Sequence, residues 1–153
     1  MNVFYPFFSD FQEKEVNVNI SSSELRCYFD YDTFHVAFFH LFENAYKYSK
    51  PNSNLDILID ESKDSVIIIF NMQSLAVEES EIPLIFTEGW SSTISKGTGK
   101  SGNGLGMYIV KRLIELNNGT IDFQPTAETK ETYSNNGLEI CYQQNRIIIN
   151  LPK

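Results

Sequence analysis

The sequence has few cysteines, no excess of basic residues and no long apolar run, and each shortage excludes a class of protein. Cys27 and Cys141 are far apart and lack a CxxC or nearby histidine pattern, so we expect reduced thiols in a cytosolic setting. The formal net charge of −8 argues against a general binder of nucleic acid or anionic membranes, which would carry a basic face. The acidic N-terminal segment is no secretory signal, and no apolar run approaches the roughly 20 residues that span a bilayer. We therefore expect a soluble, cytoplasmic chain without direct membrane contact.

Apolar residues, in contrast, are abundant. They make up 42% of the sequence and aromatic residues make up 14%, so the chain should fold rather than stay disordered. A chain of 153 residues is large enough to bury a core without disulfides or metal. There is no internal repeat and no linker, so residues 1–153 are interpreted as one domain.

The spacing of apolar residues predicts the order strand, helix, hairpin, lid, helix, hairpin. One amphipathic helix runs from Asp32, a plausible N-cap, to about Ser49, and a second spans Leu105–Leu116. Between them, Glu78–Phe86 suggests a short helical turn, and residues 87–103 form a flexible lid with almost no large aliphatic residues. The predicted strands are 15–20, 55–60, 65–70, 120–123, 138–143 and 146–152. This order predicts an α+β protein with helices on one face of a mixed sheet.

The glycine run GTGKSGNGLG at residues 97–106 matches parts of several phosphate-binding patterns. A Walker motif is rejected because Ile94 occupies the position of its first glycine. Residues 97–102 match GxGxxG, but no strand precedes them and no βαβ crossover follows. The remaining interpretation uses residues 102–106 at a helix start, where unpaired amides and the helix dipole favour an anion.

The segment His40–Ser49, HLFENAYKYS, resembles the N box of the GHKL ATPases, and in particular that of the ATP-binding domain of sensor histidine kinases. IFTEG at residues 85–89 resembles the phenylalanine box, and GNGLGMYIVKRLIELNNGTI at 102–121 resembles the second glycine box with its helix and strand. RIIINLP at 146–152 resembles the last strand, so the resemblance covers about residues 13–153 in the right order. It implies a two-layer Bergerat-type sandwich with a mixed, mostly antiparallel sheet, about three helices on one face and a flexible lid.

The resemblance also implies ATP and Mg²⁺ as ligands, with roles for particular residues. Asn44 would be catalytic and a metal ligand, because a neutral oxygen suits this hard cation. Lys47 would meet a phosphate as a point charge and Tyr48 would pack against the adenine. The other residues implied to contact the nucleotide, by close backbone approach or by charge neutralisation, are Lys96, Lys100, Gly102, Gly104, Leu105 and Gly106.

The sequence departs from the family pattern at two places. His40 stands where the family has Asn or Glu four residues before the metal-binding Asn44, which makes it a second catalytic candidate. The first glycine box, Asp-x-Gly-x-Gly, is missing, and a count without gaps places Met72 at the position of its aspartate. A one-residue insertion would place Asn71 there instead. Asn71 has a carbonyl oxygen that can accept a hydrogen bond from adenine, whereas Met72 essentially cannot accept one.

The resemblance implies a histidine protein kinase of a two-component system, which presents the γ-phosphate of Mg-ATP to a histidine on a separate dimerisation domain. A response regulator would be a further partner. The chain's histidines, His35 and His40, both lie in the N-box helix, so we expect no productive self-phosphorylation. The usual dimerisation helices are absent from the sequence, which favours a monomer. Two alternatives stay open: a degenerate, non-catalytic module that binds a partner protein, and a serine kinase of the anti-sigma type.

Overall fold

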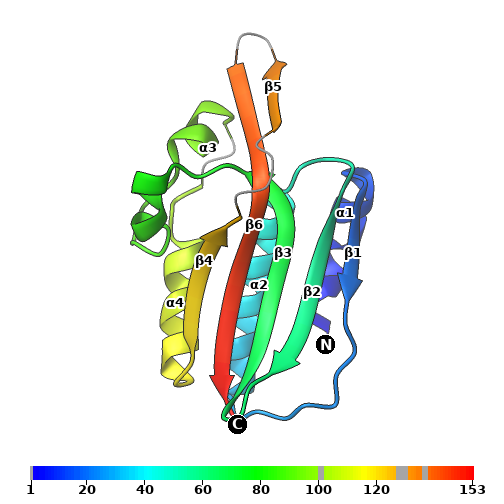
Figure 1. Cartoon of the computed structure of the whole chain (residues 1–153), viewed down its shortest axis with the longest axis vertical. Helices are drawn as coiled ribbons and strands as arrows, with labels where there is room; N and C mark the ends of the chain where they lie inside the picture. Colours follow the sequence, from blue (N-terminus) through cyan, green and yellow to red (C-terminus); the bar gives the residue numbers. More distant parts are fainter. Residues whose placement is uncertain (1, 100–101, 127–130, 136–137) are drawn as a thin grey trace.

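The computed structural model describes residues 2–99, 102–126, 131–135 and 138–153. Within these residues the strands form a six-stranded sheet in the order β1–β2–β3–β6–β4, and β5 pairs with β6 (Figure 1). The β1–β2 pair is parallel and the other pairs are antiparallel, which confirms the predicted mixed, mostly antiparallel sheet. The strands are β1 (Val16–Ile20), β2 (Ser53–Glu61), β3 (Ser65–Leu75), β4 (Thr120–Pro125), β5 (Glu131–Asn135) and β6 (Leu138–Pro152).

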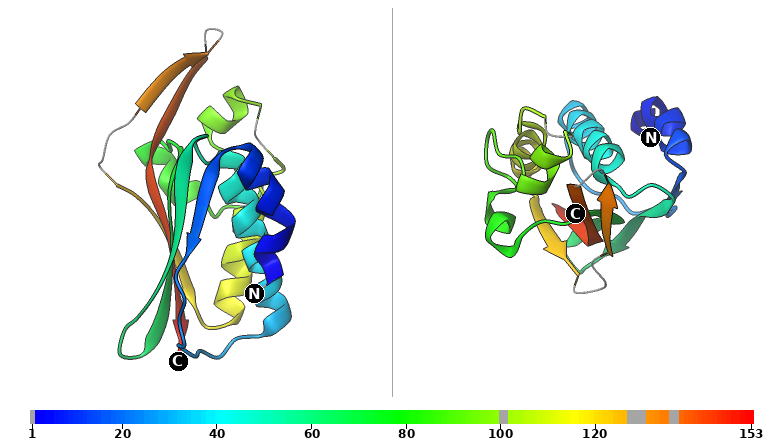
Figure 2. Two further views of the ribbon diagram at one scale, coloured as in Figure 1. Left: turned by 90° about the vertical axis from the view of Figure 1, so that its right-hand side faces the viewer. Right: turned by 90° about the horizontal axis from the view of Figure 1, so that it is seen from above.

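The helices gather on one face of this sheet, which gives the predicted two-layer sandwich (Figure 2). Two long helices, α2 (Tyr31–Tyr48) and α4 (Gly106–Leu116), lie side by side across β3, β6 and β4. The chain before β1 packs beside α2. The shorter helical elements are η1 (Asn2–Phe7), α1 (Phe8–Glu13), η2 (Glu79–Leu84) and α3 (Thr93–Gly97). Among the described residues, no helix is long and apolar enough to cross a membrane.

The core lies between α2, α4 and the sheet because each contributes one apolar face. The apolar stripe expected on the first long helix is buried as predicted: Phe34, Phe38, Leu41, Phe42 and Ala45. On β3 every second side chain is buried from Val66 to Met72, because successive residues of a strand point to opposite faces. Removal of this apolar surface from water is the main source of stability in the sandwich.

The first long helix begins earlier than the sequence predicted. Asp30, and not Asp32, is the N-cap: its backbone is extended and its Oδ1 accepts a hydrogen bond from the Thr33 amide at 2.9 Å. Asp32 lies within the first turn, where a carboxylate is favoured by the helix dipole but caps no amide. The difference moves the start of the helix to Tyr31.

The C-terminal part of the sheet also differs from the prediction. The expected strands 138–143 and 146–152 are one continuous strand, β6, because β3 pairs with it without a break from Leu75↔Tyr142 to Ser65↔Pro152. No strand was predicted between 120–123 and 138–143, but β5 lies there and pairs with the first part of β6. The β5–β6 hairpin therefore extends past the ends of the other strands, at the end of the molecule where α3 lies (Figure 1).

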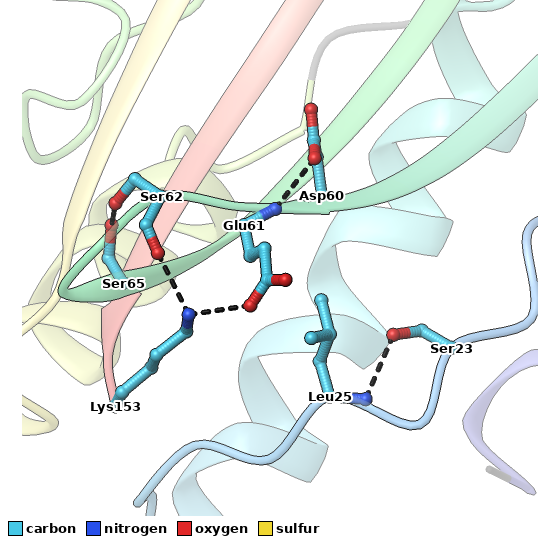
Figure 3. A network of polar contacts seen from close by, with 7 residues as sticks. All are labelled: Ser23, Leu25, Asp60, Glu61, Ser62, Ser65 and Lys153. Atoms are coloured by element: carbon cyan, nitrogen blue, oxygen red, sulfur yellow. Dashed lines mark hydrogen bonds and ion pairs between the residues drawn. The ribbon is translucent and has the colours of Figure 1, made fainter.

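The opposite end of the sheet is closed by polar contacts. Lys153 Nζ lies 2.6 Å from Glu61 Oε2 and donates a hydrogen bond to the Ser62 carbonyl oxygen at 2.8 Å. The Ser62 and Ser65 hydroxyls lie 2.6 Å apart across the same β2–β3 turn (Figure 3). This turn is at the far end of the sheet from α3 (Figure 1).

Candidate functional site

A cavity of about 390 Å³ opens between the C-terminal half of α2, the end of β3 and the start of α4. The segment between η2 and α4 forms its outer wall. Most of the residues singled out from the sequence line this cavity: His40, Asn44, Lys47, Tyr48, Met72, Gly102, Gly104, Leu105 and Gly106. Residues from distant parts of the chain therefore converge on one space, and its volume is typical of a small-molecule site.

Two of the described sequence candidates, Asn71 and Lys96, do not line this cavity. Asn71 is one residue from Met72 on β3 and so points to the other face of the sheet. Its Oδ1 accepts hydrogen bonds there from Gln144 Nε2 at 2.8 Å and Arg146 Nε at 3.4 Å. The structure thus places Met72, and not Asn71, at the cavity. Lys96 is exposed on α3 outside the wall, and Lys100 lies outside the described residues.

The wall formed by α2 carries an amide that lacks a hydrogen bond. Asn44 Nδ2 is buried, and no described residue pairs with it. Asn44 faces the first residue of α4: a methyl group built on Gly106 would lie 3.1 Å from Nδ2. A buried polar group without a partner is uncommon in proteins and costs stability, so its presence beside a cavity points to a ligand.

Lys47 lies one turn further along the same face of α2. Its Nζ is 5.4 Å from the centre of the Tyr48 ring and lies close to the backbone of Gly102. Burial raises the pKa of the Tyr48 phenol, and the charge of Glu43 raises it further, so Tyr48 stays protonated at neutral pH. This end of the cavity therefore combines a cation with the start of a helix, and both favour an anion.

The glycine loop is joined to the segment that resembles the phenylalanine box. Gly104 has a φ of +69°, and its carbonyl oxygen accepts a hydrogen bond from the Gly89 amide at 3.1 Å. A methyl group at Gly104 would lie 2.4 Å from the carbonyl carbon of Gly89, so the two loops approach too closely for any side chain here. The contact holds the loop before α4 in the wall of the cavity.

Several wall residues were missed by the sequence prediction. Glu43 lines the cavity, and its Oε2 is 3.3 Å from His40 Nδ1. His40, which stands where the family has Asn or Glu, therefore has a carboxylate partner. Ser74 lies two residues after Met72 on the same face of β3. Its position in the strand was the available signal, because alternate residues of β3 share a face.

Comparison with known proteins identifies the family. Residues 29–152 match the family model described as histidine kinase-, DNA gyrase B- and HSP90-like ATPase, and the chain belongs to this family. Within it, the sensor protein SrrB of Staphylococcus aureus is 28% identical over 94 residues, which cover 61% of this chain and 16% of SrrB. The matched region is therefore a small part of this curated relative.

Solved structures show the same fold. The mycobacterial sensor histidine kinase MprB superposes with a TM-score of 0.74 at 15% identity and covers 98% of this chain and 92% of its own. The nucleotide-free catalytic domain of the histidine kinase ThkA has a TM-score of 0.74 at 16% identity and covers 99% of this chain and 89% of its own. ThkA has also been solved in complex with the response regulator protein TrrA, and that structure has a TM-score of 0.72 at 16% identity and covers 99% of this chain and 38% of its own. The chain thus has the fold of a histidine kinase ATPase domain.

Proposed function

We propose that this chain is the catalytic domain of a sensor histidine kinase and that its cavity binds Mg-ATP with the γ-phosphate directed towards a histidine on another domain. The observation that carries the proposal is the buried, unpaired amide of Asn44 beside the first residue of α4. It is supported by the family to which the chain belongs and by the position of the cavity.

The residues of the wall suit a nucleotide triphosphate. The unpaired Nδ2 of Asn44 is a donor that suits a phosphate oxygen, and the amide oxygen of the same side chain would hold Mg²⁺. Few protein ligands are needed because this ion is commonly held by one or two side chains together with substrate phosphates. The ion would neutralise charge on the phosphates. Lys47 would supply a further positive charge, and the amides at the start of α4 would donate to phosphate oxygens. Catalysis by this chain would consist of positioning and charge stabilisation, as is usual for phosphoryl transfer.

The opposite part of the cavity suits a flat apolar base. Its wall contains Met72, Leu75, Val77 and Ile85, which line the same cavity as Tyr48. An apolar slot of this kind holds a purine by contact area, while a few polar groups fix its orientation.

The proposed protein partners follow from the relatives. ThkA is a histidine kinase that has been solved with a response regulator, and SrrB is a sensor protein. We infer that this chain acts with a domain that carries the phosphoacceptor histidine, and that a response regulator receives the phosphoryl group. Residues His35 and His40 both lie on α2, within the catalytic domain itself.

Calorimetric titration with a non-hydrolysable ATP analogue and Mg²⁺ tests the proposal. We expect metal-dependent binding that is lost in Asn44→Ala and retained in the control Asn17→Ala, because Asn17 is exposed on β1. Binding that is equal in the presence of EDTA, or unchanged in Asn44→Ala, would contradict it.

Met72 favours a second candidate function, a non-catalytic module that keeps the fold and binds a partner protein. The thioether of Met72 cannot replace the carboxylate that the family uses to recognise adenine. In that case the folded chain would show no nucleotide binding even at millimolar concentration.

A further inference from the structure

The base end of the cavity contains a polar group that is held by a buried network. Ser74 is in the cavity wall with only 4% of its surface exposed, and Asn145 lies behind it with 0% exposed. Asn145 on β6 is directly opposite Met72 on β3. Met72 stands where the family has its aspartate, so Asn145 lies beside that position.

The hydrogen bonds of Asn145 determine which way its amide points. Asn145 Nδ2 lies 3.2 Å from the carbonyl oxygen of Leu75, which can only accept, so the atom in this position must be the nitrogen. The same nitrogen lies 2.7 Å from Ser74 Oγ, and an amide has two hydrogens, one for each partner. Asn145 Oδ1 in turn accepts from Gln143 Nε2 at 2.8 Å.

This arrangement leaves Ser74 as a hydrogen bond donor. Its oxygen accepts from Asn145, and the structure shows no acceptor for its hydroxyl hydrogen among the described residues. A serine hydroxyl carries one hydrogen, which is therefore available to a ligand in the cavity.

We infer that Ser74, oriented by Asn145, contacts the purine base as a donor, and that the site accepts adenine and guanine nucleotides with similar affinity. The inference rests on the proposed nucleotide-binding function. Both purines present an acceptor on the same edge, N1 in adenine and O6 in guanine, whereas selection of adenine needs an acceptor for its amino group. Met72 supplies none at this place. A site without that acceptor discriminates weakly, because the amino group of adenine and the N1–H of guanine are then left equally without a protein acceptor.

Calorimetry with Mg²⁺ and non-hydrolysable ATP and GTP analogues tests the inference. We expect the two dissociation constants to differ by less than about tenfold in the unaltered chain. Ser74→Ala should weaken both by about three- to tenfold, the loss expected for one neutral hydrogen bond. Ser65→Ala is the control, since Ser65 begins the same strand at its far end and contacts Ser62 there. Met72→Asp should restore an acceptor and favour the ATP analogue by at least about tenfold.

Asn145 acts through Ser74 and is a positioning residue. Asn145→Leu should therefore weaken binding in the unaltered chain but have no further effect in the Ser74→Ala background. Equal losses in both backgrounds would show a purely structural role and would overturn this assignment.

The outcomes separate the inference from the proposed function. Binding that depends on Asn44 but is unchanged by Ser74→Ala overturns the inference alone, as does a preference for the ATP analogue above about tenfold in the unaltered chain. Absence of binding for both analogues overturns the proposed function and this inference together.

Discussion

The side-chain amide of Asn44 lies against Gly106, so that a methyl group at Gly106 would come within 3.1 Å of Asn44 Nδ2. One residue is on α2 and the other begins α4, and the contact brings the proposed metal ligand to the start of a helix. The absence of a side chain at position 106 is therefore a requirement of the site.

Gly106→Ala is expected to impair nucleotide binding more than folding. The added methyl group would push the Asn44 amide away from its position, and we expect metal-dependent affinity for the ATP analogue to fall by about tenfold. The free energy of unfolding should change little, because alanine is a better helix former than glycine by about 1 kcal/mol. Titrations with Mg²⁺ and with EDTA measure the effect, and a loss that is equal in both would contradict it.

Gly104→Ala is expected to destabilise the fold. A methyl group at this position would lie 2.6 Å from the backbone nitrogen of Trp90, and the φ of +69° disfavours any other residue. We expect a loss of about 1–3 kcal/mol in the free energy of unfolding. Gly97→Ala is the matched control because a methyl group at Gly97 would have no neighbouring atom within 4 Å. Urea denaturation of both variants measures the difference, and equal midpoints would show that the loop contact does not matter.

Asp30 is expected to stabilise α2 in a pH-dependent manner. Its hydrogen bonds with Thr33, above all the one from the backbone amide, hold the pKa of the Asp30 carboxyl below its ordinary value. A group with a depressed folded-state pKa stabilises the fold above its unfolded-state pKa of about 3.9, and the effect is lost as the pH falls through the folded value. The difference in Tm between the unaltered chain and Asp30→Ala should thus be largest above about pH 4 and shrink below it. A difference that is constant from pH 2 to neutrality would refute this account.

Phe38→Ala is expected to cost much of the stability of the domain. Phe38 is 2% exposed, and its ring centre lies 4.0 Å from that of Phe34 and 5.7 Å from that of Phe70. Removal of a buried phenylalanine costs about 3–5 kcal/mol in transfer and cavity energy. Phe39→Ala is the neighbouring control, since Phe39 is 39% exposed, and its loss should be clearly smaller. Denaturation midpoints of the two variants compare them directly.

The parts of the fold that the sequence predicted are those with a regular apolar period. The stripe from Phe34 to Ala45 follows the helical period, and the second helix follows it as well, so both were placed within a few residues. The strand β5 was missed because its sequence, ETYSN, has no apolar alternation and its pairing depends on the neighbouring β6. The five-residue helix α3 was missed because it depends on a local cap, from Ser92 to the Ser95 amide, rather than on a period.

Part of the candidate site was likewise predicted from the sequence. The residues on α2 and at the start of α4 were found because their order along the chain resembles a known pattern. The choice between Asn71 and Met72 was not possible, because SVIIIF is apolar on both faces and does not show which face is buried. Asn145 was missed because the polar residues QQN at 143–145 interrupt the apolar pattern and so indicate the end of a strand. In the structure the strand continues, and the amide of Asn145 is satisfied by a hydrogen bond to Ser74 on the neighbouring strand.

The central place of β6 constrains the order in which the chain can fold during synthesis. This strand joins β3 on one side to β4 and β5 on the other, yet it is the last of the strands to leave the ribosome. Until residues 138–152 have emerged, β4 has no partner in the sheet and the edge of β3 is open. Pairing between strands so distant along the chain is slow, and open edges are prone to associate with other chains. Nascent chains that lack β6 should thus depend on chaperones, and the sheet should close in one late step.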